Sequence, residues 1–141
     1  MNKVREFQDE YRWLSNFAPV NIQYGDYIYA SVEAAFMSAK SEDISWKLFC
    51  ADPRNPAGKI KKESKLLPVL PNWFDISLGI MEDCLRKKFT QEPYYSLLLA
   101  TGDMVLEEGN MWNDKFWGIC LKTGHGHNHL GRLIMKIRKE L

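Results

Sequence analysis

The chain has 141 residues, of which 45% are hydrophobic and 26% are charged, and its formal net charge is +1. This length suits one domain with a real core, and the small net charge excludes long-range electrostatic capture of nucleic acid. Cys50, Cys84 and Cys120 form no CxxC pair, which indicates reduced thiols in a cytoplasmic protein. The N-terminus has no apolar leader and no run approaches membrane-spanning length, so no membrane partner is expected.

In chain order, the pattern predicts short β elements over residues 3–29, with a tight hairpin turn at 24–27. Helices are then expected over residues 31–40 and 44–50, and a third helix has Asn55 as N-cap and Pro56 as its first residue. Further elements are expected as a helix capped by Asp75 and ending at Phe89, a helix from Pro93 through Leu99, a short strand at 104–108, and a helix from near Asn128 to the C-terminus. The expected fold class is mainly α (α+β): a compact helical single domain over residues 1–141 with short N-terminal β elements.

The helix expected at residues 31–40 places an acid and an amine on one face. Ser31 is a good N-cap, and Glu33 lies in the first turn, where the helix dipole favours a carboxylate. Glu33, Met37 and Lys40 follow i, i+4, i+7 spacing and share a face. The two charged residues are about 10 Å apart along the axis, which is too far for a simple surface pair and suits a small ligand between them. The alternative is two solvated charges on an amphipathic helix.

A polar turn flanked by aromatic residues lies in the N-terminal part. Ser15 and Asn16 are turn formers with free hydrogen-bonding side chains, and Trp13 and Phe17 flank them. A base or sugar can stack on such aromatics while the polar groups fix its orientation. The alternative is a surface turn anchored by two buried aromatic side chains.

The third helix carries the one basic cluster of the sequence: Lys59, Lys61, Lys62 and Lys65. Four lysines within seven positions suit a phosphate group or a nucleic-acid backbone. A charge run is more often a solvated face, and Glu63 dilutes this one.

All three histidines fall within residues 124–129, a glycine-containing segment that leads into the last expected helix. Their spacing fixes no metal geometry, so no metal is expected. Free amides at a helix N-terminus suit a phosphate or pyrophosphate, whereas Asn128 alternatively does no more than cap the helix. Cys120 is a candidate reactive thiol, although nothing near it in sequence activates it.

Taken together, the motifs resemble the NADAR (YbiA-like) family almost from end to end. The matching segments are Leu14-Ser15-Asn16-Phe17-Ala18-Pro19, Ser31-Val32-Glu33 with Phe36 and Lys40, Pro56-Ala57, Trp73, Met81, Lys88-Phe89, residues 99–102, residues 106–108, Asp114-Lys115-Phe116-Trp117-Gly118 and residues 128–138. The resemblance implies a mainly helical, YbiA-like single domain that cleaves N-glycosidic bonds without a cofactor. It implies as substrates ADP-ribose attached to guanine bases, free or in nucleic acid, or the early ribosylated pyrimidine intermediates of riboflavin synthesis.

The resemblance also implies the catalytic residues. Lys40 occupies the position of the family's Schiff-base lysine, and Glu33 that of its helix glutamate, a proton shuttle. The residues expected to hold the sugar, base and phosphates are Arg12, Ser15, Asn16, Phe17, Met37, Asp114, Trp117, Gly118, His127 and Asn128. The chain departs from the family pattern at Ala34, where His is usual, at Met37, where Gln is frequent, and at Cys120, where Gly is common. The loss of an amide at Met37, on the same face as Glu33 and Lys40, is expected to change substrate choice or rate.

Three other interpretations stay open at this point. In the first, Glu33 stabilises an oxocarbenium ion in a direct hydrolysis and Lys40 only binds phosphate. In the second, the chain is a non-catalytic module that binds ADP-ribose or a nucleotide. In the third, it is a structural or interaction protein with an aromatic surface.

Overall fold

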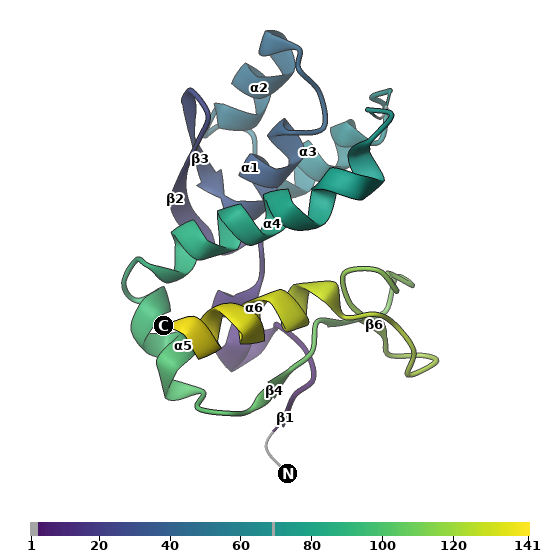
Figure 1. Cartoon of the computed structure of the whole chain (residues 1–141). Helices are drawn as coiled ribbons and strands as arrows, with labels where there is room; N and C mark the ends of the chain where they lie inside the picture. The colour runs from purple at the N-terminus through teal and green to yellow at the C-terminus, as the bar shows by residue number, and fades with distance from the viewer. Residues whose placement is uncertain (1–2, 69) are drawn as a thin grey trace. The chain divides into compact units, whose positions relative to one another are not determined.

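The structure, a computed structural model, describes residues 3–68 and 70–141, and these are mainly helical with a few short strands (Figure 1). The expected fold class is therefore confirmed. The chain forms two compact units: a central unit, Asn16–Lys88, and a terminal unit made of residues 3–15 and Phe89–Leu141.

The central unit begins with a hairpin. Strand β2, Pro19–Tyr24, pairs antiparallel with β3, Tyr27–Ser31, and Gly25 in the two-residue turn has φ 60°. A positive φ is one that glycine adopts without a steric penalty, so this turn was predictable from local sequence. Ile22 and Tyr29 point into the core from the two strands and are almost completely buried.

Helix α1, Val32–Ser38, follows β3 without a linker. The Ser31 hydroxyl accepts a hydrogen bond from the Ala34 amide at 3.0 Å, which confirms the expected N-cap. The helix ends two residues earlier than predicted, and every residue in it is buried because α2, α3 and the hairpin pack around it. The interpretation of Glu33 as a solvated surface charge is therefore wrong: its exposed fraction is 6%.

Helix α2, Ile44–Ala51, begins as the sequence predicts. The Asp43 side chain accepts from the Ser45 amide at 2.9 Å and so caps the first turn. After the helix, Asp52 and Arg54 form an ion pair at 2.7 Å that fixes the turn leading to α3.

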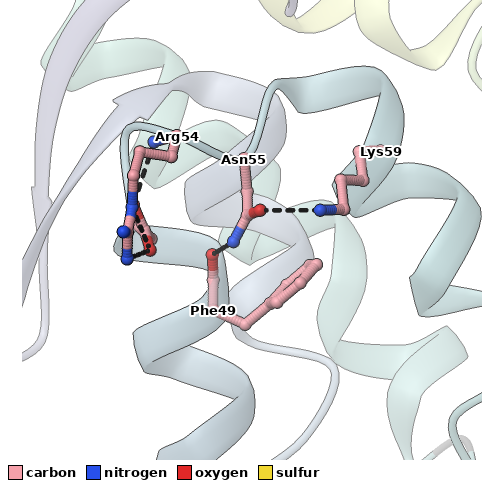
Figure 2. Close-up of polar contacts among 5 residues, drawn as sticks. Phe49, Arg54, Asn55 and Lys59 are labelled. Carbon is pink, nitrogen blue, oxygen red and sulfur yellow. Dashed lines mark hydrogen bonds and ion pairs between the residues drawn. The ribbon is translucent and has the colours of Figure 1, made fainter.

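Helix α3, Ala57–Ser64, begins one residue later than predicted, and its N-cap is Pro56, without a side-chain cap. The predicted cap, Asn55, uses its side chain elsewhere (Figure 2). Its amide nitrogen donates to the Phe49 carbonyl at 3.0 Å, and its oxygen accepts from the Lys59 ammonium at 3.1 Å. Asn55 therefore ties the end of α2 to the first turn of α3.

Helix α4, Trp73–Phe89, starts before the predicted cap, so Asp75 is a first-turn residue and not the N-cap. The Trp73 and Asp75 amides donate to the Leu70 and Asn72 carbonyls at 3.0 Å each, which carries the helical turn upstream of the aspartate. The most buried side chains of the helix are Ser77, Met81, Cys84, Leu85, Lys88 and Phe89. Cys84 in this helix and Cys50 in α2 are both free, buried cysteines.

The terminal unit combines two-stranded parallel pairs with three helices. Its elements are β1 Lys3–Val4, the 3-10 helix η1 Asp9–Leu14, α5 Tyr94–Ala100, β4 Val105–Leu106, β5 Gly109–Asn110, β6 Ile119–Cys120 and α6 His129–Glu140. Strand β1 pairs with β4, and β5 pairs with β6. Helix α6 lies beside β4 (Figure 1).

Helix α6 buries one apolar face. Leu130, Ile134 and Ile137 are buried, Leu133 is half-buried, and Leu141 at the end of the chain has an exposed fraction of 40%. Across the described ranges, none of the helices has the length and apolar character needed to cross a membrane.

Candidate active site

Lys40 follows α1 in a turn that three hydrogen bonds fix. Its own amide donates to the Met37 carbonyl at 3.1 Å. The Trp46 indole donates to the same carbonyl at 2.8 Å, and the Lys47 ammonium donates to the Ser38 carbonyl at 3.0 Å. Side chains of α2 thus satisfy carbonyls that a helix C-terminus leaves unpaired, and they hold the backbone that carries Lys40.

The Lys40 side chain lies against an aromatic wall. Its Nζ is 6.0 Å from the centroid of the Trp73 ring, and the Trp73 ring is tilted against Phe36, with centroids 5.1 Å apart. Phe36 comes from α1 and Trp73 from the first residue of α4. The wall keeps Lys40 half-buried and shields one side of its amine from water.

Burial lowers the pKa of Lys40 below its ordinary value of 10.5, because removing water disfavours the charged form. The carboxylate of Glu33 partly opposes this, whereas the ammonium groups of Lys61 and Lys65 lower the same pKa further. The amine and the acid predicted to act together therefore interact electrostatically. A lysine in such surroundings has a larger neutral, nucleophilic fraction than an exposed one.

Glu33 is linked to the polar turn at the start of the central unit. Its amide donates to the Asn16 carbonyl at 3.0 Å. The Asn16 side chain is buried, with an exposed fraction of 8%; its Nδ2 contacts the Met81 sulfur at 3.5 Å, and its Oδ1 has no hydrogen-bond partner. A buried, unpaired amide oxygen costs free energy that a ligand donor can recover.

Phe17, the next residue, has an exposed fraction of 38%, so the interpretation of this turn as one anchored by buried aromatics does not hold for Phe17. The Lys61 Nζ lies 5.8 Å from its ring centroid. A Cβ on Gly58 of α3 would lie 4.0 Å from the same ring. The central unit thus holds five of the predicted site residues: Asn16, Phe17, Glu33, Met37 and Lys40.

Three residues around Lys40 were not among the predicted site residues: Trp73, Lys61 and Lys65. The two lysines were visible only as members of a cluster of four, and Trp73 only as a matching motif. Their proximity to Lys40 comes from the packing of α3 against α1 and from the Phe36–Trp73 contact, and neither is a local sequence property.

The other predicted site residues belong to the terminal unit. Arg12 is exposed on η1, and its Nη1 donates to Gln8 Oε1 at 3.5 Å. Ser15 is half-buried just after η1, where its amide donates to the Arg12 carbonyl at 2.9 Å.

Asp114 shapes the loop that carries Trp117. Its Oδ1 accepts from the amides of Phe116 and Trp117 at 3.1 and 3.0 Å. Asn110 clamps the same residue, because its Nδ2 donates to the Asp114 carbonyl and its Oδ1 accepts from the Asp114 amide, both at 2.9 Å. Asp114 was predicted to bind the substrate, but its Oδ1 is already hydrogen-bonded to two backbone amides of the loop.

Gly118 and Asn128 both lie against Glu108. A Cβ on Gly118 would overlap the carbonyl and the carboxylate of Glu108. Asn128 has φ 54°, and its Oδ1 accepts from the Glu108 amide at 3.0 Å while its Nδ2 donates to the Leu106 carbonyl at 2.9 Å. Asn128 is the N-cap residue of α6 by position, yet its side chain makes no cap hydrogen bond.

The imidazoles of His127 and His129 stack, with centroids 5.3 Å apart and planes 8° apart. The His129 ring lies 4.6 Å from that of Phe116, and burial, followed by the charges of His127 and Arg132, lowers its pKa. Within residues 3–68 and 70–141, no three His, Cys, Asp or Glu side chains gather as metal ligands. The stacked His127 and His129 rings and the Phe116 ring form an aromatic cluster.

Comparison with known proteins gives one consistent result. The NADAR domain family model matches residues 4–141. An N-glycosidase of Nostoc punctiforme is 33% identical over 93% of this chain and 86% of its own length. N-glycosidase YbiA of Escherichia coli is 32% identical over 94% of this chain and 83% of its own length. The NMR structure of E. coli YbiA superposes with a TM-score of 0.84 at 27% identity, covering 98% of this chain and 82% of that one.

A longer relative shares the same region. A riboflavin biosynthesis protein of Vibrio vulnificus is 33% identical over 96% of this chain, and this chain spans 37% of its length. The matched region is thus a module within that larger protein. With the family model matching almost every residue, the chain belongs to the NADAR domain family.

Proposed function

We propose that this chain hydrolyses the N-glycosidic bond between a ribose and a nucleobase-type amine, with Lys40 as nucleophile and Glu33 as proton shuttle. The N-glycosidase class rests on the family and on relatives of that name which align over most of their own length. The observation that supports the proposed chemistry is the half-buried Lys40 amine, which interacts with the buried Glu33 carboxylate and lies against Trp73.

The proposed substrates are ADP-ribose on a guanine base or a ribosylated pyrimidine intermediate of riboflavin synthesis. The second is suggested by the riboflavin biosynthesis protein of Vibrio vulnificus that contains the matched module. Both substrates join the anomeric carbon of a ribose to a nitrogen of a heteroaromatic amine, so one mechanism serves either.

In the proposed mechanism, neutral Lys40 attacks the anomeric carbon of the ring-opened sugar. The carbon–nitrogen bond to the base breaks, a protonated imine forms between that carbon and Lys40 Nζ, and Glu33 in its acid form gives its proton to the leaving base. The Glu33 carboxylate then takes a proton from water as the water adds to the imine carbon. Collapse of that adduct releases the free sugar and returns the neutral amine, so the net reaction consumes one water.

The proposed substrate contacts in the central unit are Asn16, Phe17 and Met37. The unpaired Asn16 Oδ1 suits a sugar hydroxyl or a base amine, and the exposed Phe17 ring suits stacking. Four residues of the terminal unit are still predicted to contact the substrate: Arg12, Ser15, Trp117 and His127. We propose a different role for Asp114, Gly118 and Asn128, which shape the loop that carries Trp117.

Borohydride trapping tests the proposal. Wild-type protein incubated with an ADP-ribosylated guanine, or with a ribosylated aminopyrimidine, is expected to release the base and, on reduction, to carry a sugar adduct at Lys40. Lys40→Arg keeps the positive charge but not the nucleophile and is expected to lose both activities. Turnover by wild type without any adduct, together with residual turnover by Lys40→Arg, would instead favour direct hydrolysis with Lys40 as a phosphate ligand.

A panel of ribosylated bases also tests the binding-module alternative. Saturable binding of ADP-ribose with no base released from any substrate would show a non-catalytic module. We further propose that residues 1–141 act as one domain, because the family match runs through both units. A cytoplasmic location is proposed because the three cysteines are free thiols.

A further inference from the structure

The strands of the terminal unit have one buried face and one face that reaches solvent. Residues 105–110, which contain β4 and β5, pair with β1 on one side and with β6 on the other. Successive side chains of a strand point to opposite faces. The buried face carries Val4, Leu106, Asn110 and Cys120. The odd-numbered residues of the same three segments therefore belong to the second face.

This second face contains a cavity of about 210 Å³. Its lining comes from the three paired segments and from the loop after β6: Lys3, Arg5, Glu107, Ile119, Leu121 and Gly124. The cavity exceeds the roughly 150 Å³ that holds a benzene-sized molecule, and it is smaller than the roughly 300 Å³ at which pockets for drug-sized ligands begin. It therefore suits a single ring or a branched aliphatic group and is too small for a nucleotide.

The cavity has one positive charge that no acid of the protein neutralises. Lys3 Nζ and Glu107 Oε2 are 3.2 Å apart, so these two charges cancel. Among residues 3–68 and 70–141, the side chain of Arg5 has neither a hydrogen-bond partner nor an ion-pair partner. A guanidinium presents parallel N–H donors that match the two oxygens of a carboxylate. The single remaining charge matches a carboxylate monoanion better than a phosphate dianion.

The other wall of the cavity is apolar. Ile119 is half-buried, and Leu121 has an exposed fraction of 37%. Both residues come from the β6 side of residues 105–110, whereas Arg5 comes from the β1 side. The cationic wall and the apolar wall are thus on opposite sides of the cavity, and a ligand with a carboxylate at one end and an apolar group at the other matches both.

We propose that this cavity binds a small monocarboxylate that carries one aromatic ring or one branched aliphatic group. The carboxylate of the ligand pairs with the Arg5 guanidinium, and its apolar group packs on Ile119 and Leu121. The bound acid connects β1 to β6 and so stabilises the terminal unit. None of the residues of the proposed reaction takes part, so this site goes beyond the proposed function and does not depend on it.

An NMR titration with benzoate tests the site, because benzoate combines a carboxylate with one ring. Benzamide has the same shape without the charge and is the matched probe. Benzoate is expected to shift the backbone amide resonances of Arg5, Leu121 and Gly124 in a saturable way. Benzamide is expected to bind at least about tenfold more weakly, because it loses a charge-assisted contact. Equal affinities for the two probes, or no saturable shift with benzoate, would overturn the proposal.

Arg5→Gln removes the proposed anion ligand from an exposed position, so the fold should be unaffected. It is expected to raise the Kd of benzoate at least about tenfold. Lys122→Gln is the matched control, because it removes one exposed positive charge next to Leu121 but outside the cavity lining. It is expected to leave the Kd unchanged. The same loss in both variants would assign the effect to overall charge and overturn the site.

Glu107→Gln should change the affinity in the opposite direction. It leaves Lys3 as a second unpaired positive charge, so benzoate is expected to bind about two- to fivefold more tightly, the scale of one surface ion pair. Inorganic phosphate is expected to displace benzoate from this variant and not from wild type. Weaker benzoate binding by Glu107→Gln, or displacement by phosphate from wild type, would overturn the charge balance on which the proposal rests.

Thermal unfolding measures the proposed stabilisation separately. Saturating benzoate is expected to raise the Tm of wild type, because a ligand that binds only the folded state stabilises it. Arg5→Gln is expected to show no such rise at the same benzoate concentration, and Lys122→Gln is expected to behave as wild type does. A wild-type Tm that benzoate leaves unchanged would overturn the proposal.

Discussion

The Trp46 indole nitrogen donates to the Met37 carbonyl, three residues before Lys40, at 2.8 Å. The Lys40 amide donates to the same oxygen, so one carbonyl links the core of α2 to the backbone of the proposed nucleophile. Trp46→Phe removes the donor and keeps the aromatic stack on Phe49, whose centroid lies 5.5 Å away. We expect the free energy of unfolding to fall by about 0.5–1.5 kcal/mol and kcat to fall more than KM changes. Urea unfolding and steady-state kinetics measure both, and an unchanged kcat would show that this bond does not position Lys40.

The pH dependence of Lys40 reactivity should move in opposite directions when its neighbours are changed. Glu33 stabilises the ammonium, so Glu33→Gln is expected to lower the pKa of Lys40 and move its labelling profile to lower pH. Lys65 destabilises the ammonium, so Lys65→Gln is expected to raise that pKa and move the profile to higher pH. Mass spectrometry of reductive labelling across pH measures the shift. Turnover by Glu33→Gln should fall by on the order of 10²- to 10⁴-fold, the usual contribution of a positioned acid–base group.

The burial of Lys88 is expected to make the free energy of unfolding depend on pH. It is completely buried, and burial lowers its pKa from 10.5 to about 7. Between these values the unfolded chain binds more protons than the folded one, so stability rises with pH from about 7 towards 10.5 and is lowest below about 7. Lys88→Met is expected to flatten this rise, which urea unfolding between about pH 7 and pH 9 measures. An equally steep rise in the variant would assign the dependence to other groups.

The unpaired, buried Oδ1 of Asn16 leads us to expect that a variant without it keeps or gains stability and loses function. Asn16→Leu removes the unpaired buried oxygen and keeps the branched shape and the number of heavy atoms of the side chain, so the free energy of unfolding should stay equal or increase. Among the described residues, the Asn16 side chain then gives up only its weak contact with the Met81 sulfur. If the oxygen binds the substrate, KM rises at least about tenfold, the value of one hydrogen bond left unmade. A destabilised variant with normal KM would give Asn16 a purely structural role.

Asp114→Ala should affect the Trp117 loop through the backbone. The change removes the acceptor of the Phe116 and Trp117 amides, and we expect the free energy of unfolding to fall by about 1–3 kcal/mol. Asp114→Asn keeps an Oδ1 acceptor and is the matched control, with a smaller loss. Equal losses in the two variants would show that the negative charge, and not the acceptor, is what the loop needs.

Local chemistry explains what the sequence predicted well. The Ser31 cap and the turn at residues 24–27 each depend on residues within three positions of one another, and both are present. The caps predicted at Asn55 and Asp75 were wrong for two different reasons. The Asn55 side chain binds the Phe49 carbonyl in α2, and the helical turn begins upstream of Asp75 through hydrogen bonds to Leu70 and Asn72.

The site was predictable only in part. The Glu33–Lys40 spacing predicted the pair that we propose as catalytic, but the sequence did not show that packing buries α1 on all sides. The surroundings of Lys40 depend on which side of α3 meets α1, and a run of four lysines does not encode that choice. The engagement of Asn128 with Leu106 and Glu108, about twenty residues upstream, is likewise a tertiary event.

The two bonds of Asn128 limit how the protein can be engineered. A donor and an acceptor are both required at one buried, left-handed position, and neither aspartate nor serine offers the two at that geometry. A library that diversifies the histidine loop to reach new sugars should therefore hold residue 128 constant and randomise residues 125 and 127 instead. Evolutionary drift in this loop faces the same restriction, so variation should accumulate on either side of the asparagine.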